Sequence, residues 1–388
     1  MEKINIKIFD IVSFMVFNAC CITIYYGNFF SKLQIIFAIL SMLYLIKKIN
    51  VIFLKKYRKF NLAFISFMAV SVLSCIINSG GFTTSIIFFL KLFILLVFTE
   101  YMHNQNKENA VIKQYGLLYF AYVILSILVQ YVNPELFELN RRNYLIGNKF
   151  AVSYAAFMSV IFLDSYRKNY NLKGLKLKLY YLLLLVFSIL VCYTTSCNTG
   201  LICCALYILF DFLNSKKLKS GTTVLIVALL SSVTLIFFRE YFLNLPIVKY
   251  IVVDVLHRNL TLSGRVQIYE NMFAIIFQKK FLGYGYNNSY SILYPLIQAP
   301  NTQNALVEWW FNSGLIGLGM LLTSIYINFE NMKKNYAKKF NEDSFIMGIY
   351  IFLILGSIEI TIGTAFFVLL LFSNIGNFKG SWCVDEKK

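Results

Sequence analysis

The feature that most constrains this chain is the recurrence of apolar runs of about 20 residues, separated by short clusters of Lys and Arg. A helix needs about 20 apolar residues to cross a bilayer, because each residue adds about 1.5 Å. Charged residues make up only 14% of the chain, against about 25% in soluble domains. The pattern therefore predicts an all-α integral membrane protein.

Twelve of these runs are predicted as transmembrane helices, which gives a single polytopic membrane domain over residues 1–388. They lie at residues 8–27, 30–46, 60–78, 82–101, 113–132, 150–165, 179–196, 198–213, 221–238, 304–327, 344–360 and 363–378. The ninth and tenth spans are separated by residues 239–303. Because connections between elements are usually about 4–6 residues long, we expect this long loop to carry function.

The distribution of positive charge predicts the topology. Of the 36 basic residues, 25 fall on one side of the predicted spans and 10 on the other. Lys and Arg concentrate in cytoplasmic loops, so both termini are predicted to be cytoplasmic and the loop 239–303 external. Charges placed between apolar runs also argue against a nucleic-acid partner; membrane lipid is the expected surrounding.

Nine of the ten outward basic residues lie in only two loops, 133–149 and 239–303. This concentration favours an anionic ligand outside the cytoplasm, although long translocated loops also tolerate charge. The sequence contains no H-E-x-x-H or D-x-D pattern and no phosphate-binding G-x-x-x-x-G-K loop. The cysteines show no metal-ligand spacing. We therefore expect no metal and no cofactor.

Polar groups inside the apolar runs are further candidates. Thr194–Gly200 reads as a polar turn between two short helices, and its Ser, Thr, Asn and Gly are also ordinary turn residues. Glu308 could pair with Lys91 inside the bundle, as could Glu359, because a buried charge costs about 2.5–3.5 kcal/mol unless it is paired. Alternatively, Glu308 lies at the mouth of an outward cavity, one helical turn from Asn304.

Several short motifs follow one another along residues 142–317. They are Arg142 followed by Gly147-Asn148, Thr195-Ser-x-x-Thr-Gly200, Ser263-Gly-Arg265, Leu282-Gly-Tyr-Gly-Tyr286, and Gln303-Asn304 followed by Gly314-Leu-Ile-Gly317. Their order resembles the O-antigen polymerase and O-antigen ligase superfamily. The resemblance covers roughly residues 130–330. Superfamily members are multi-span bacterial enzymes of surface polysaccharide assembly with a long external loop late in the chain, so it implies the bacterial cytoplasmic membrane.

The resemblance also implies roles for individual residues. It implies that Arg142 and Arg265 contact the undecaprenyl diphosphate of the donor. The remaining substrate-binding candidates are Asn198, Gly283, Gly285 and Asn304, and the catalytic candidates are Arg265, Glu308, His257 and Gln303.

Two departures from the superfamily pattern matter. Members often have Arg where this chain has Asn198, and ligases typically have His where this chain has Gln303. Because Gln cannot serve as a general base, the change favours a polymerase over a ligase. His257 and Glu308 remain as candidate bases.

The resemblance thus implies a metal-independent glycosyltransferase that polymerises undecaprenyl-diphosphate-linked oligosaccharide repeat units into capsule or O-antigen at the outer face of the membrane. A flippase and a chain-length regulator would be its protein partners. Two alternatives stay open. One is a lipid-linked oligosaccharide flippase, which would also need many spans and cationic groups; the other is an O-antigen ligase-type transferase.

Overall fold

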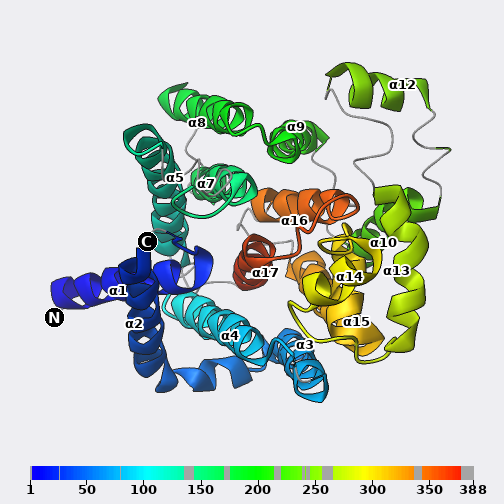
Figure 1. The fold of residues 1–388 in the computed structure, drawn as a ribbon. Coiled ribbons are helices and arrows are strands. Elements are labelled where there is room, and N and C mark those ends of the chain that lie inside the picture. The colour runs from blue at the N-terminus through cyan, green and yellow to red at the C-terminus, as the bar shows by residue number, and fades with distance from the viewer. Residues whose placement is uncertain are drawn as a thin grey trace.

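The computed structural model describes residues 2–25, 27–78, 80–134, 144–169, 175–213, 220–237, 241, 245–255, 265–335 and 343–376. Within these ranges the chain forms helices and no β-strand (Figure 1). The helices are α1 Glu2–Val16, η1 Phe17–Cys21, α2 Gly27–Ile46, η2 Ile49–Phe53, α3 Arg58–Ile77, α4 Phe82–Asn104, α5 Glu108–Val132, α7 Lys149–Asn169, α8 Leu175–Thr194, α9 Asn198–Leu213, α10 Gly221–Phe237, α12 Pro246–Lys249, η4 Tyr250–Val255, α13 Arg265–Gln278, α14 Ser289–Ile297, α15 Ala305–Asn335, α16 Asp343–Leu355 and α17 Thr364–Gly376.

Every predicted span overlaps at least one of these helices, so the all-α prediction is confirmed for the described residues. Five helices are both long and apolar enough to cross a bilayer, namely α2, α3, α4, α5 and α15. Shorter apolar stretches of 10–17 residues occur in α1–η1, α8, α9, α10, α16 and α17. The helices therefore indicate a membrane protein. The count of twelve crossings, the side of the termini and the external position of the loop stay predictions.

Helix α17 lies at the centre of the bundle (Figure 1). It packs against α4, α7, α15, α16 and η1. Every side chain from Phe366 to Phe372 is buried. Among the aromatic contacts, the rings of Phe67, Phe367 and Trp309 lie with centroids 5.0–5.8 Å apart. A helix that is apolar all round is stable only when it is covered on every side, which is why this segment is the core.

The described part of the long loop folds back onto the first half of α15. Helix α13 buries Tyr269, Met272 and Ile276, whose spacing of three and four residues puts them on one face. This face forms a second small core with Val307 and Phe311 of α15. Figure 1 shows α13 running beside α15 at the edge of the bundle. The segment Arg265–Gln278 of the long loop is thus a helix with one buried apolar face.

A buried carboxylate fastens α7 to two other helices. Asp164 on α7 is fully buried and accepts hydrogen bonds from the hydroxyls of Tyr207 on α9 and Ser344, each 2.7 Å long. Its oxygens also pair with Arg167 at 2.6 Å and Lys168 at 2.7 Å. Because buried charge is stable only when it is paired and hydrogen-bonded, this network fixes how α7, α9 and α16 meet.

Candidate active site

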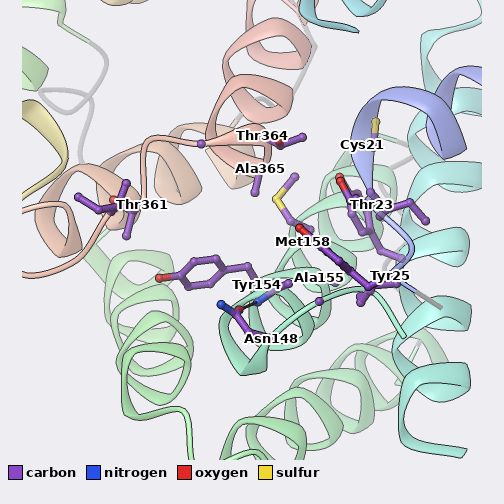
Figure 2. Close-up of a pocket in the computed structure, with 17 residues that line it drawn as sticks. Cys21, Thr23, Tyr25, Asn148, Tyr154, Ala155, Met158, Thr361, Thr364 and Ala365 are labelled. Atoms are coloured by element: carbon purple, nitrogen blue, oxygen red, sulfur yellow. Dashed lines mark hydrogen bonds between the residues drawn. The ribbon is translucent and has the colours of Figure 1, made fainter. Parts of the chain in front are cut away.

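A cavity of about 410 Å³ opens where η1 ends and where α7 and α17 begin (Figure 2). Three distant parts of the chain supply most of its lining. The lining residues are Cys21, Ile22, Thr23, Tyr25, Tyr119, Ile146, Gly147, Asn148, Ala151, Tyr154, Ala155, Met158, Ile360, Thr361, Gly363, Thr364 and Ala365. The predicted motif Gly147-Asn148 thus lies on a cavity wall.

Backbone contacts shape the wall between η1 and α7. The Tyr25 N–H donates to the Leu145 carbonyl at 2.9 Å. Gly147 has φ +121°, and a Cβ there would lie 3.1 Å from the Tyr25 ring. The Asn148 side chain caps α7 by accepting two backbone hydrogen bonds of 3.1 and 3.2 Å. Gly147 is therefore needed for a close turn against Tyr25, and Asn148 is ordered by the helix that it starts.

The loop between α16 and α17 joins the cavity to the start of α15. The Ala305 N–H donates to the Gly356 carbonyl at 2.6 Å. The indole Nε1–H of Trp309 donates to the Ile362 carbonyl at 2.9 Å. Ile360, Thr361 and Gly363 of the same loop line the cavity. The start of α15, which carries Glu308 and directly follows Gln303 and Asn304, is thus fixed to the rim of the cavity.

Asn304 and Gln303 lie at this junction. Asn304 is fully buried, and its Oδ1 accepts hydrogen bonds from the N–H groups of residues 306 and 307 at 3.1 and 3.2 Å. It is the N-cap of α15. Gln303 has φ +55°, and its amide donates to Asn301 at 2.7 Å. The geometry gives Asn304 a capping role, and its predicted role in substrate binding stays a prediction.

Glu308 lies one turn after Asn304, as predicted, with its N–H bonded to the Asn304 carbonyl at 2.8 Å. Its side chain is 7% exposed. One carboxylate oxygen accepts two 3.0 Å hydrogen bonds from Thr302, and the other accepts from Asn312 at 3.5 Å. Among the described residues no ion pair joins Glu308 to Lys91. The carboxylate is held by neutral donors around the start of its own helix.

Gly283 and Gly285 pack against a break in α15. The predicted continuous span is interrupted at Gly314, whose φ of 68° and ψ of −176° are not helical. At this break the Tyr284 N–H donates to the Phe311 carbonyl at 2.8 Å, and the Gly285 N–H donates to the Asn312 carbonyl at 2.9 Å. A Cβ on Gly283 would lie 2.5 Å from a carbonyl oxygen of α15. These glycines let the loop backbone approach α15 closely, and their predicted role in substrate binding stays a prediction.

Tyr286 completes this contact. Its ring stacks on Phe88 at 4.7 Å and on Trp309 at 5.7 Å between centroids. Burial raises the pKa of the Tyr286 phenol, and the Glu308 carboxylate raises it further. The neutral phenol can therefore stack between Phe88 and Trp309, and this stack holds the loop against the start of α15.

Asn198 begins α9 directly after the predicted polar turn. The chain reverses at Ser196, which has φ +53°, so the prediction of two short helices is confirmed. The Lys149 ammonium at the start of α7 donates to the Ser196 carbonyl at 3.3 Å. The hydroxyls of Ser153 and Thr195 lie 3.2 Å apart. The turn is thereby fixed to the same helix end that lines the cavity.

The structure gives the least information on the basic candidate residues Arg142, His257 and Arg265. Arg265 is the first residue of α13, and its side chain lies outside what the structure describes. Arg142 and His257 also lie outside the described residues. One turn after Arg265, the Tyr269 hydroxyl bonds to the carbonyls of Gln303 at 3.0 Å and Ser357 at 3.2 Å. Helix α13 is therefore fastened to both the start of α15 and the α16–α17 loop.

The described residues contain no group of three His, Cys, Asp or Glu side chains placed to hold a metal ion. Their seven cysteines are all buried and free, as expected of small residues in helix packing.

Comparison with known proteins gives one match. Residues 181–322 match the family model described as O-antigen ligase. Over this segment, which is less than half of the chain, the sequence is similar to the O-antigen polymerase and ligase superfamily. Searches of curated proteins and of solved structures found no match. Together with the apolar helices, the match supports a membrane protein with a function of the O-antigen polymerase or ligase type.

Some of the candidate site residues lie inside the matched segment and others lie outside it. The matched segment contains Asn198, His257, Arg265, Gly283, Gly285, Gln303, Asn304 and Glu308. Arg142 and every residue that lines the cavity lie outside it. The α16–α17 loop connects the two parts through its bonds to Ala305 and Trp309.

Sequence reasoning missed most of the cavity lining. Tyr25, Tyr154, Thr361 and Thr364 were not singled out, because Tyr and Thr are common in and beside apolar runs. The only sequence feature that could have indicated these four residues is their position along the predicted spans. All four lie near those ends of predicted spans that share a side with the two basic loops.

Proposed function

We propose that this protein polymerises undecaprenyl-diphosphate-linked oligosaccharide repeat units into surface polysaccharide, capsule or O-antigen, at the outer face of the cytoplasmic membrane. The observation that carries the proposal is the superfamily match over residues 181–322, together with Gln303 at the position where ligases typically have His. Supporting it, α13, the start of α15 and the cavity rim are bonded to one another.

The proposed reaction exchanges one glycosidic bond. A hydroxyl oxygen of the acceptor unit bonds to the anomeric carbon of the donor glycan, and the bond from that carbon to the diphosphate oxygen breaks. Undecaprenyl diphosphate leaves with the bonding electrons. Cations fixed at the departing oxygens stabilise this transition state more than the ground state. Arg265 and Arg142 are the proposed cations, because a guanidinium gives planar bidentate contacts to phosphate.

The acceptor hydroxyl must also lose its proton to a base. Gln303 has a neutral amide and cannot take it. Both oxygens of Glu308 already accept hydrogen bonds, from Thr302 and Asn312. That environment favours a structural role for Glu308 and makes His257 the stronger candidate for the base.

Arg265 gives the first test. Arg265→Ala is expected to lower polymer formation about 10²–10³-fold, the cost of removing one group that stabilises a developing negative charge. Arg265→Lys should recover part of the activity, because an ammonium lacks the bidentate geometry. The measurement is the length distribution of surface polysaccharide from cells in which immunoblots show equal amounts of each protein.

Lys249 provides a matched control, since it is an exposed basic residue of the same loop, on α12. Lys249→Ala should leave the polysaccharide unchanged. Normal polymer from Arg265→Ala at normal abundance would remove Arg265 from the mechanism.

A further inference from the structure

Resting on the proposed function, we propose that the cavity between η1, α7 and α17 binds a neutral sugar ring of the acceptor glycan, and that the Tyr154 hydroxyl hydrogen-bonds to it. The superfamily match does not include the cavity. Its volume of about 410 Å³ falls within the range of small-molecule sites, which is roughly 300–1,000 Å³.

The chemistry of the lining fits a sugar. None of the described residues that line the cavity carries a formal charge. The lining includes Thr23, Thr361, Thr364 and Asn148 together with aromatic and apolar residues. A sugar ring offers the complementary mixture, with hydroxyls at its edge and C–H groups on its faces. A diphosphate would instead require cations.

Tyr154 supplies the observation that points to a ligand. Its hydroxyl is buried, and no group of the described protein hydrogen-bonds to it. Leaving a buried polar group unsatisfied costs about 1–3 kcal/mol, so such groups usually have a partner. Figure 2 shows the Tyr154 ring between Asn148 and Thr361 on the cavity lining. A hydroxyl of a bound sugar would satisfy it.

The position of the cavity agrees with an acceptor site. Its rim loop is bonded to Ala305 and Trp309, directly after Gln303 and Asn304. Tyr269, one turn after Arg265 on α13, hydrogen-bonds to the same loop at Ser357. A sugar held in the cavity would therefore lie against the loop that also holds α13, the helix that begins at Arg265.

The test uses full-length protein in nanodiscs. The probe is the lipid-free oligosaccharide released by mild acid from the lipid-linked repeat units that a deletion strain accumulates. Tyr154→Phe keeps the ring and removes only the hydroxyl. Because a neutral hydrogen bond contributes about 0.5–1.5 kcal/mol, its loss should weaken binding of the probe and raise the acceptor KM about 3- to 10-fold, with kcat little changed.

Tyr115→Phe is the matched control. Tyr115 is also a buried tyrosine of the bundle, but it does not line the cavity, so its variant should bind and polymerise like the wild type. Ala151→Trp, which fills the cavity from α7, should abolish binding in protein that still elutes as a single folded species. Arg265→Ala should lose polymerisation and keep binding.

Two results separate this inference from the proposed function. Binding of the oligosaccharide that depends on Tyr154, in a wild-type protein that makes no polymer, would support the cavity and contradict the polymerase. Polymerisation by the wild type, with unchanged binding and KM in both Tyr154→Phe and Ala151→Trp, would overturn the cavity as the sugar site.

Discussion

At the scale of single residues, Gly283 and Gly285 determine how the long loop meets α15. In the structure they let the loop approach α15 where that helix breaks at Gly314. The residue type indicated the close approach, whereas the identity of the neighbour depended on a break that an apolar run does not reveal. Asn304 is similar, because an Asn before an apolar run is typical of a helix cap and of a binding site alike.

Gly314 allows this contact to be tested by one substitution. Its backbone conformation is adopted almost only by Gly, and forcing another residue into such a region costs about 1–3 kcal/mol. A Cβ would also lie 2.0 Å from the Phe281 carbonyl oxygen. Gly314→Ala should therefore lower the thermal unfolding midpoint of the purified protein in detergent and impair polymer formation.

Gly319, five residues later on the same helix, is the control. Nothing lies within 4 Å of a Cβ built there. Gly319→Ala should leave stability unchanged or raise it by up to about 1 kcal/mol, since Ala is the better helix former. Equal unfolding midpoints for Gly314→Ala and wild type would mean that the break in α15 is absent in solution.

At the scale of elements, local sequence patterns predicted where the helices lie along the chain. They did not predict which helices contact one another. The polar residues from Thr194 to Gly200 predicted two helices, and the chain does turn at Ser196. The Asp164 network was not predicted. Its partners Tyr207 and Ser344 are far away in sequence, and nothing local indicates that α7, α9 and α16 meet at one carboxylate.

Asp164→Asn tests whether this network holds the three helices together. The substitution removes the charge that Arg167 and Lys168 neutralise, and it weakens hydrogen bonds to a charged group, each of which contributes about 1.5–3 kcal/mol. We expect a loss of roughly 2 kcal/mol or more in unfolding free energy. Denaturant titration of the purified protein in detergent measures it.

Asp211 belongs to the same network and provides a control for the Asp164 substitution. It pairs with Lys168 at 2.8 Å, and its side chain is 38% exposed. Because exposed ion pairs contribute about 0–1 kcal/mol, Asp211→Asn should change stability little. A result in which both substitutions cost the same would mean that Asp164 is not the centre of the network.

At the scale of the whole molecule, composition and periodicity predicted the helices well. Apolar runs set helix positions directly, so every predicted span overlaps at least one helix. The cavity could not be predicted, because residues near 22, 148 and 362 come together only through packing around α17. Patterns along a chain record which faces are apolar, and they do not record which apolar faces meet.

The polymerase proposal depends on what the purified protein does with lipid-linked repeat units in liposomes. We predict a ladder of longer glycans, formed without ATP, nucleotide sugar or divalent metal and in the presence of a chelator, because Arg residues are proposed to stabilise the leaving diphosphate. Arg265→Ala should form no ladder under the same conditions. If the wild-type protein forms no ladder while the lipid-linked units cross the bilayer, the protein is a transporter and the proposal is wrong.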